Sequence, residues 1–401
     1  MNISFSPPDI TELEIEAVAD AMRSGWITTG PRTKELEIRL AGYFGVPRTV
    51  CLNSQTICAE MTLRVLGIGP GDEVIVPAYT YTASASIIKH VGARIIMVDS
   101  QKDTYEMDYD LLEAAITPRT KAIIPVDLGG VVCDYDRMFD IVESKRSLFQ
   151  PGNSLQRAFG RVMIVADTAH ALGASRGDLQ AGAIADFSNF SFHAVKNLTT
   201  AEGGCVAWKE NPNIDDDELY KKYMLYSLHG QSKDALAKTK MGDWEYDIVI
   251  PGYKGNMTDI MAAIGLAQLE RYPELLDRRA EIVRRYDEGF ADLPLYSRPH
   301  QTADYSGSRH LYMIHLQGLD ETARNEFIIK MGELGVACNV HYKPLPMFSA
   351  YKNMGFDMAD YPNAFQLYKN EVTLPLHTLL TDEQVEYVIS SVRKVLEEMN
   401  R

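Results

Sequence analysis

Lys196 is the first residue whose type and surroundings suggest chemistry. It lies in a polar segment, residues 191–204, between two apolar runs that we expect to be strands, 187–192 and 205–208. A lysine that follows a buried strand can have a depressed pKa and act as the amine of a Schiff base. An ordinary surface lysine is equally consistent with this segment taken alone.

Asp167 is the second candidate, because it follows the apolar run 161–166. Open α/β sheets bind ligands at the carboxyl ends of their strands, which is where this carboxylate would lie. A buried carboxylate there could keep a pyridinium nitrogen protonated, so that the ring acts as an electron sink. The alternative for a single aspartate is that it only caps the helix that follows.

Residues 53–57 form a third candidate segment, which reads Asn-Ser-Gln-Thr-Ile and precedes a predicted helix. Backbone N–H groups and hydroxyls at a helix N-terminus bind phosphate well. Small polar residues at such a position are more often only helix caps. A phosphate cradle, an acid at a strand end and a later lysine together make a stronger case than any one of them.

Alternating strands and helices are expected to position these residues. Several of the short apolar runs, such as 122–126, contain almost no polar residue. Such runs are typical of strands in a mainly parallel sheet that is covered on both faces. The predicted strands are 73–77, 94–98, 121–126, 161–166, 187–192 and 205–208.

The alternation ends near residue 250, and the pattern beyond it predicts a second, smaller domain. We therefore expect a large α/β domain over residues 1–255 and a smaller α+β domain over 256–401, on which the N-terminal segment could pack. After a long helical stretch, 258–293, the smaller domain is predicted to contain a strand at 311–316, a helix at 323–334 and a strand at 337–341.

Two capping-box pairs mark helix starts, Thr11 with Glu14 and Thr381 with Gln384. They predict an N-terminal helix over 13–22 and a C-terminal helix over 382–399, and another helix is expected between Pro31 and Gly45.

Charge and cysteine content exclude several classes of protein. The 401 residues include 40 Lys and Arg against 55 Asp and Glu, for a net charge of −15. Binding of nucleic acid or of an anionic membrane surface normally requires an excess of the opposite sign, so neither is expected as a partner. The 5 cysteines form no metal-ligand pattern and suit a reducing, cytoplasmic location. No signal peptide or membrane-spanning run is expected.

Residues 144–161 are an exception in this acidic chain, because they contain Lys145, Arg146, Arg157 and Arg161 but no Asp or Glu. The loop-forming residues around Pro151 predict a basic loop. The simplest interpretation is a solvated excursion between a helix and a strand.

The order of these motifs resembles the sugar aminotransferases of antibiotic and surface-polysaccharide pathways, the DegT/DnrJ/EryC1/StrS type. The resemblance covers almost the whole chain, at residues 24–31, 115–118, 167–170, 191–196, 251–256 and 340–344. It is greatest to members that aminate a 4-keto nucleotide sugar, such as those making 4-amino-arabinose or pseudaminic acid precursors. The resemblance implies a pyridoxal 5′-phosphate (PLP) enzyme with the aspartate aminotransferase-like fold, fold type I.

The resemblance also implies roles around the cofactor ring. Lys196 would hold PLP and later shuttle a proton, and Asp167 would pair with the pyridine nitrogen. His170 would lie near the ring and its phenolic oxygen, and Tyr81 falls where the family places an aromatic residue against the ring.

Phosphate and subunit contacts follow in the same way. Thr56, the backbone of Ile57 and Ser191 would hold the phosphate of the cofactor. Asn256 would reach the phosphate in the neighbouring subunit, which implies a homodimer with shared active sites. Gln55 and Ile57 replace smaller residues usual in the family, so we expect a differently shaped cradle.

The substrate side is implied by three residues. His341 and Tyr342 lie where family members close over the sugar, and His193 could contact the substrate or play a supporting polar role. Pro346 stands where a second histidine is common in the family, so the sugar contacts should differ here.

The resulting prediction is an aminotransferase that moves an amino group from L-glutamate to a keto group, at C4, of a nucleotide-linked sugar. Two alternatives remain, a keto-cyclitol aminotransferase and a non-catalytic protein that keeps the fold for binding. The diphosphate of a nucleotide sugar would need nearby basic groups, for which the candidates are Lys233, Lys238, Lys240, Arg146 and Arg157.

Overall fold

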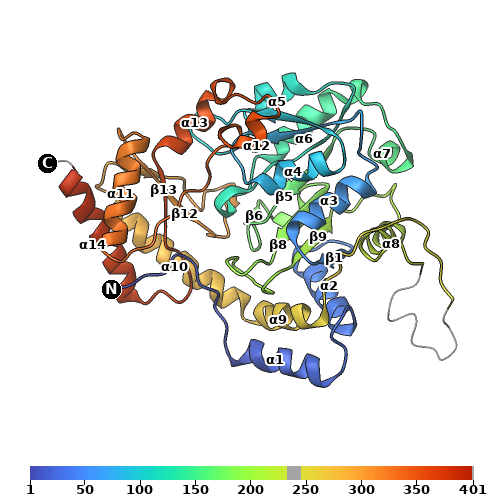
Figure 1. Cartoon of the computed structure of the whole chain (residues 1–401), viewed down its shortest axis with the longest axis horizontal. Coiled ribbons are helices and arrows are strands. Elements are labelled where there is room, and N and C mark those ends of the chain that lie inside the picture. The colour runs from blue at the N-terminus through green and yellow to red at the C-terminus, as the bar shows by residue number, and fades with distance from the viewer. Residues whose placement is uncertain (233–244, 400–401) are drawn as a thin grey trace.

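A computed structural model describes residues 1–232 and 245–399 (Figure 1). A seven-stranded sheet in the order β1-β9-β8-β5-β4-β2-β3 forms its centre. Four of the six neighbouring pairs are parallel, and only the pairs that include β9 are antiparallel. The strands are β1 (Thr49–Leu52), β2 (Glu73–Pro77), β3 (Arg94–Val98), β4 (Thr120–Ile123), β5 (Met163–Asp167), β8 (Phe187–Ser191) and β9 (Gly204–Trp208).

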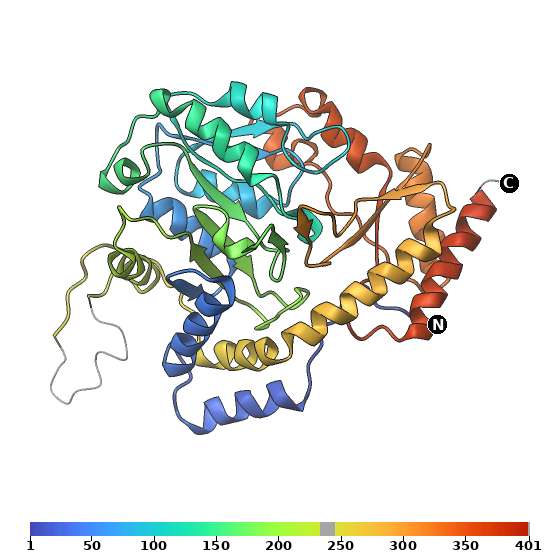
Figure 2. The same cartoon turned by 180° about the vertical axis from the view of Figure 1, so that it is seen from behind.

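Helices surround this sheet, as the views from the front and from behind show (Figures 1 and 2). The buried strands and the helices share one continuous apolar core, as expected for a sheet covered on both faces. The helices are α1 (Glu12–Arg23), α2 (Pro31–Phe44), α3 (Gln55–Val65), α4 (Thr82–His90), α5 (Tyr109–Ala115), α6 (Tyr135–Ser144), α7 (Ser154–Phe159), α8 (Asp216–Ser227), α9 (Asp259–Glu270) and α10 (Tyr272–Phe290).

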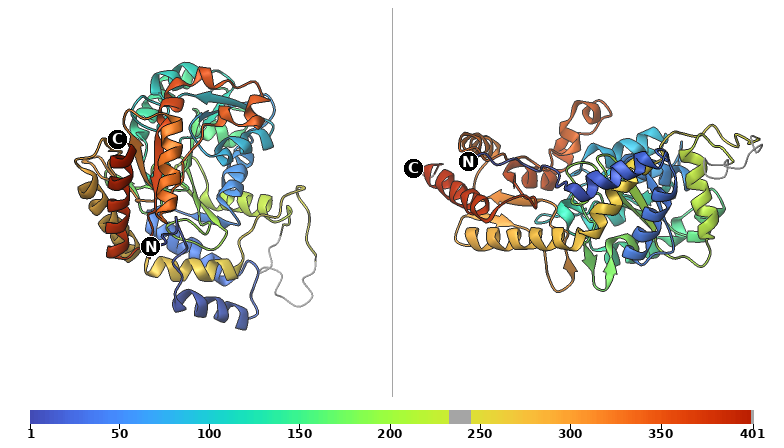
Figure 3. Two further views of the ribbon diagram at one scale, coloured as in Figure 1. Left: turned by 60° about the vertical axis from the view of Figure 1, so that its left-hand side comes forward. Right: turned by 90° about the horizontal axis from the view of Figure 1, so that it is seen from below.

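A second apolar core lies at the end of the molecule where both termini are found (Figures 1 and 3). Its three-stranded sheet has the order β10-β12-β13, and α10 extends into it from the larger part. Ile3 is buried there, and its N–H donates to Gly335 O at 2.8 Å. The elements are β10 (Leu295–Ser297), β12 (Tyr312–Leu316), β13 (Glu371–Leu374), α11 (Glu321–Glu333) and α14 (Asp382–Met399).

Two short helices pack against the first core, and a small sheet lies beside the main one. The short helices are α12 (Ser349–Lys352) and α13 (Pro362–Lys369), and the small sheet contains β6 (Ser175–Arg176), β7 (Leu179–Gln180) and β11 (Tyr305–Ser306). Across the described ranges 1–232 and 245–399, no helix is both long and apolar enough to cross a membrane.

The predicted fold class, a mainly parallel α/β sheet with further α+β structure, is confirmed. Both capping boxes form, and the predicted strands 73–77 and 94–98 have the observed bounds. The domain boundary near residue 255 stays a prediction. The predicted helical stretch 258–293 is two consecutive helices, α9 and α10.

The predicted strand at 337–341 is wrong, because this segment forms only an isolated bridge between Asn339 and Thr373. The backbone of Asn339 pairs with that of Thr373, and Ala337 N–H donates to Ile3 O, but distant side chains take up the backbone groups of His341. His341 N–H donates to Glu371 Oε2 at 2.9 Å, and Tyr79 donates its hydroxyl to His341 O at 3.0 Å. β12 pairs with β10 on one side and with β13 on the other, and neither partner strand was predicted from the sequence.

The basic segment 144–161 is folded rather than a simple loop. It contains α7, whose cap residue Asn153 also donates from Nδ2 to Leu66 O at 2.9 Å. Its charges are largely paired, since Arg161 contacts Asp186 at 2.7 Å and Arg146 contacts Glu143.

Asp259, at the start of α9, caps the N-terminus of α2 and so joins the two helices. The first turn of α2 follows Gly30, which has no side chain with which to cap the exposed N–H groups. Asp259, the first residue of α9, accepts from the N–H groups of Gly30 at 2.8 Å and Thr33 at 3.0 Å and from the Thr33 hydroxyl, all at Oδ1. A carboxylate buried in this way is stabilised by its donors and orders both helices.

We predict that Asp259→Ala lowers the free energy of unfolding by at least about 2 kcal/mol, because several buried donors lose their acceptor. Asp259→Asn is the matched control, since its single amide oxygen can keep the Oδ1 contacts. Urea denaturation followed by circular dichroism measures both variants. An alanine variant as stable as the wild type would show that Asp259 contributes little to holding α2 on α9.

Candidate active site

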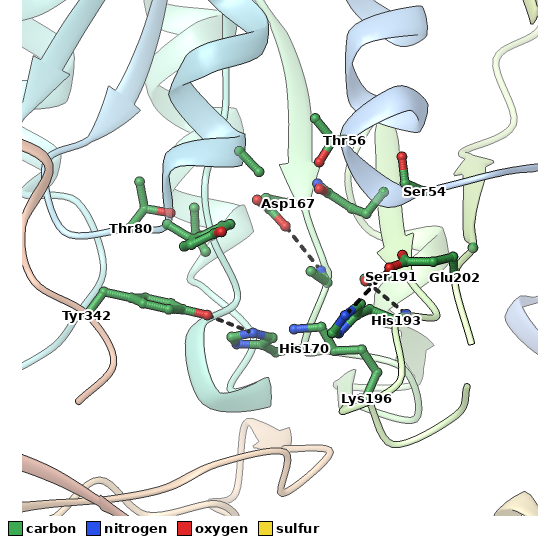
Figure 4. Close-up of a pocket in the computed structure, with 16 residues that line it drawn as sticks. Ser54, Thr56, Thr80, Asp167, His170, Ser191, His193, Lys196, Glu202 and Tyr342 are labelled. Carbon is green, nitrogen blue, oxygen red and sulfur yellow. Dashed lines mark hydrogen bonds and ion pairs between the residues drawn. The ribbon is translucent and has the colours of Figure 1, made fainter. Parts of the chain in front are cut away.

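A cavity of about 310 Å³ opens at the carboxyl ends of β5 and β8, where the sequence analysis expected a ligand site (Figure 4). It is lined from the start of α3, the start of α4, the end of β5 and the segment after β8, with Tyr342 from the region before α12. Of the predicted site residues, eight line it: Thr56, Tyr81, Asp167, His170, Ser191, His193, Lys196 and Tyr342.

Lys196 lies in the cavity on the turn that follows β8, where its N–H donates to His193 O at 2.9 Å. Burial of the ammonium group lowers the pKa of Lys196 to about 8, and the charge of Asp167 partly opposes this shift. The side chain therefore has a substantial unprotonated fraction close to neutral pH, as an amine nucleophile requires.

Asp167 ends β5 and is buried across the cavity from Lys196. Its carboxylate accepts from the Ser84 hydroxyl at 2.7 Å and from Ala169 N–H at 3.2 Å. Burial raises the pKa of Asp167, whereas these two donors and the charge of Lys196 lower it. A protonated ring nitrogen placed beside the Asp167 carboxylate would add a charged donor to its two hydrogen bonds.

His170 is held with a defined tautomer. Gly129 N–H donates to His170 Nδ1 at 3.2 Å, so Nδ1 is the acceptor and the ring proton lies on Nε2. Nε2 faces the Tyr342 hydroxyl at 3.3 Å (Figure 4), and the His310 ring lies 4.3 Å away between centroids. Burial and then the charge of Lys196 lower the pKa of His170 well below its usual value, which keeps the ring neutral.

The start of α3 forms a polar wall of the cavity. Ser54, Gln55 and Thr56 line it, and Gln55 Nε2 is buried without a hydrogen-bond partner among the described residues. β9 passes directly behind this wall, because a Cβ on Gly204 would lie 2.6 Å from Gln55 N. Only glycine permits so close an approach, so β9 directly supports the start of α3 at the wall of the cavity.

Ile57, a predicted phosphate contact, does not line the cavity. Its N–H donates to Ser54 Oγ at 3.2 Å and so serves the cap of α3. The role of this N–H in phosphate binding stays a prediction, and it would require the cap to open.

The mouth of the cavity is lined by exposed side chains. His193 Nε2 lies 3.7 Å from Glu202 Oε1, and Ser191 Oγ accepts from His193 N–H at 3.4 Å. The Tyr81 ring is 57% exposed and lies 5.5 Å from the Tyr342 ring, at an interplanar angle of 39°. Tyr81 therefore has a free ring face on which a planar group could stack.

Asn256 and His341 do not line the cavity within their own chain. Asn256 donates from Nδ2 to Thr29 Oγ1 at 2.6 Å and accepts from Lys254 Nζ. His341 lies behind Tyr342, with ring centroids 4.9 Å apart, and the charge of Lys196 contributes to lowering its pKa.

Ser84, which contacts Asp167, and Glu202, which lines the cavity, are site residues that were not predicted from the sequence. Glu202 belongs to the polar segment after β8, so its composition was a usable signal. Ser84 is one of several small residues in α4, and nothing in its spacing indicates contact with Asp167, 83 positions later in the chain. The basic residues Arg146 and Arg157 do not line the cavity, whereas Lys233, Lys238 and Lys240 lie outside the described residues.

This architecture and its cavity place the chain among the PLP-dependent transferases of fold type I. Residues 8–393 match the profile of the DegT/DnrJ/EryC1/StrS aminotransferase family, and the chain belongs to that family. It is an aminotransferase that depends on PLP.

Similar proteins support the assignment along the full length. The spore coat polysaccharide biosynthesis protein SpsC of Bacillus subtilis (strain 168) is 36% identical over 398 residues, 98% of this chain and 97% of SpsC. The PLP form of the proposed sugar aminotransferase Spr1654 from Streptococcus pneumoniae is 58% identical with a TM-score of 0.97, covering 100% of both chains. Helicobacter pylori PseC, an aminotransferase involved in the biosynthesis of pseudoaminic acid, is 28% identical with a TM-score of 0.86, covering 99% of this chain and 100% of its own.

The residues present fit this cofactor. Asp167 can hold a pyridinium nitrogen, and the Lys196 amine can capture an aldehyde. The Gln55 side chain lies beside Asp167 and helps to lower the pKa of that carboxyl, and the start of α3 offers backbone donors to a phosphate.

We predict that the rate at which the apoprotein takes up PLP rises with pH through about 8, because the unprotonated Lys196 amine is the nucleophile and burial lowers its pKa to about 8. Stopped-flow absorbance at a series of pH values measures the rate. Asp167→Asn should shift the profile to lower pH, since the charge that raises the pKa of Lys196 is removed. A midpoint near 10.5 would contradict the assigned environment.

Proposed function

We propose that this aminotransferase moves an amino group from L-glutamate to a keto group, at C4, of a nucleotide-linked deoxy sugar for surface polysaccharide or natural-product synthesis. The single observation that carries the reaction type is the cavity in which Lys196 and Asp167 face each other across space for a planar cofactor. The sugar acceptor is supported by the family and by relatives named for polysaccharide and pseudoaminic acid biosynthesis.

PLP, when bound, supplies an electron sink that stabilises negative charge at the carbon next to the transferred nitrogen. The residues of the chain supply the proton transfer and the positioning of the ring. Asp167 keeps the ring nitrogen protonated, Lys196 Nζ moves the proton to and from the reacting carbon, and Tyr81 covers one ring face. His170 offers its Nε2 proton to the Tyr342 hydroxyl at the wall of the cavity.

Thr56 and Ser191, with the start of α3, hold the phosphate in this proposal, and the N–H of Ile57 could join them only if the cap opened. His193 and Tyr342 contact the substrate from the mouth and from the wall beside it. His341 packs behind Tyr342 and so supports the side of the cavity that closes over the sugar in this proposal.

We predict that L-glutamate yields 2-oxoglutarate when the holoenzyme is offered a nucleotide keto sugar, and that a free keto-cyclitol gives at least about tenfold less product, because only the nucleotide sugar offers the diphosphate as a binding handle. The assay is a panel of both ketone classes, with 2-oxoglutarate quantified. Lys196→Ala should abolish turnover, and Lys209→Ala, an exposed lysine after β9, is the matched control.

A keto-cyclitol that outperforms every nucleotide sugar would overturn the acceptor class while leaving the aminotransferase assignment intact. Turnover retained by Lys196→Ala would overturn the assignment of the nucleophile. A protein with no PLP absorbance and no turnover would favour a binding role.

Asn256 is proposed to act across a homodimer, because it lies outside the cavity of its own chain, on a segment beside the start of α3. In a symmetric dimer the same segment of each copy can reach the other site.

We predict that a heterodimer of one Lys196→Ala chain and one Asn256→Ala chain recovers about half of the wild-type activity, because one of its two sites then has both residues. Each homodimeric variant should be strongly impaired. Two affinity tags isolate the heterodimer, and sedimentation gives its mass. An inactive heterodimer would place Asn256 in its own chain's site, and an active monomer would refute the dimer.

A further inference from the structure

Glu371 is a fully buried carboxyl group that the proposed reaction does not use. It lies on β13, in the second core, and its side chain points toward the segment that leads to Tyr342. Glu371 Oε2 accepts from His341 N–H at 2.9 Å, and Oε1 accepts from the Thr373 hydroxyl at 2.6 Å. A buried carboxyl with two well-placed donors is a built feature of the fold rather than a solvated charge.

Thr373 bridges this carboxyl to a histidine ring. Its Oγ1 lies 2.9 Å from His341 Nδ1 while its single hydroxyl proton is directed at Glu371. A hydroxyl has only one proton to donate, so Thr373 must accept from His341 if it donates to Glu371. The ring proton of His341 then lies on Nδ1, and Nε2 is an acceptor.

The polarity of this chain of hydrogen bonds reverses when Glu371 is protonated. The carboxylic acid then donates to Thr373 Oγ1, and the hydroxyl turns to donate to His341 Nδ1. The ring proton must move to Nε2, which becomes a donor. The only net change is the uptake of one proton, at Glu371.

His341 is held in place by several contacts, so a shift of its ring proton changes the hydrogen bonding of a fixed ring. Besides the Glu371 contact, its carbonyl accepts from the Tyr79 hydroxyl at 3.0 Å, and its ring stacks on Phe5 at 5.6 Å with an interplanar angle of 20°. Burial and the charge of Lys196 lower the pKa of His341 to about 3, so the ring carries one proton throughout the neutral range.

We propose that Glu371, acting through Thr373, sets which ring nitrogen of His341 carries the proton beside the active-site cavity. Glu371 is thus a positioning residue. It switches His341 Nε2 between a hydrogen-bond donor and an acceptor at the wall formed by Tyr342. The inference rests on the proposed site role of His341 but does not depend on the identity of the acceptor substrate.

The switch falls in an accessible pH range. Burial raises the pKa of Glu371 to about 8, opposed by Thr373, by His341 N–H and by the charge of Arg324 on α11. Four other acids face Glu371, and burial raises the pKa of each: the phenols of Tyr79, Tyr105 and Tyr342 and the thiol of Cys338. His315 lies opposite Glu371 on β12, and burial lowers the pKa of this histidine. These shifts carry the titrations of these groups away from neutral pH. Lys196, whose charge acts on His341, also has a pKa of about 8, so the loss of the step in Glu371→Gln is the result that assigns it to Glu371.

The test is the ¹⁵N spectrum of histidine-labelled holoenzyme, without substrate, between pH 6.5 and 9.5. The signals of His341 are assigned among the nine histidines by their loss in His341→Phe. We expect the protonated nitrogen to be Nε2 at the low end and Nδ1 at the high end. One unchanged tautomer across this range in the wild type would overturn the proposal, and this measurement requires no other variant to fold.

Three variants separate the relay from a merely structural role. Glu371→Gln cannot ionise and should show one tautomer at every pH, and Thr373→Val should lose the step because the bridging hydroxyl is gone. Thr373→Ser keeps the hydroxyl and should restore it. A step that persists in either Glu371→Gln or Thr373→Val would also overturn the proposal. Since no substrate is present, either failure is distinct from a failure of the sugar assignment.

Discussion

The structure depends on keeping an amine and a carboxylate out of water within one cavity. Asp167 and the strand that leads to Lys196 are neighbours, because β5 and β8 pair in parallel with Asp167 opposite Asn189. Burial alone would drive both groups to their neutral forms. Each charge opposes that tendency in the other, since Asp167 raises the pKa of Lys196 and Lys196 lowers that of Asp167. The sheet therefore creates a site in which both groups stay reactive.

The surroundings of this pair are polar but carry little charge. Burial lowers the pKa values of His170, His310 and His341, and the charge of Lys196 contributes in each case. Neutral rings add no positive charge beside the amine, so they can supply hydrogen bonds without depressing its pKa further. The defined tautomer of His170, set by Gly129 N–H, is one example of such a contact.

The second core contributes to the site through a few long-range contacts. β13 carries Glu371 and Thr373, and both reach the segment of His341 and Tyr342. Tyr79, which follows β2 of the main sheet, binds the same segment from the other side. The wall of the cavity at Tyr342 is thus held between the two cores rather than by its own secondary structure.

Local pattern was sufficient for much of the fold and for the central residues of the site. Runs such as 73–77 and 94–98 are apolar except for their first residue, and short runs of this kind between helical stretches are typical of strands inside a covered sheet. Asp167 ends β5 and Lys196 lies on the turn that follows β8, so predicting these two strands was enough to bring their side chains to the same edge of the sheet.

Only the tertiary structure decided the parts that depend on contacts distant in sequence. β13 escaped prediction because it alternates Glu371 and Thr373 with apolar residues, as an exposed edge strand would, although all four of its positions are buried. The segment 337–341 was predicted as a strand, but its last residue, His341, has its backbone groups taken by the side chains of Glu371 and Tyr79. Ser84 meets Asp167 only because α4 packs beside β5. A sequence specifies local periodicity directly, whereas the partner of a buried polar group is fixed only when distant elements are packed together.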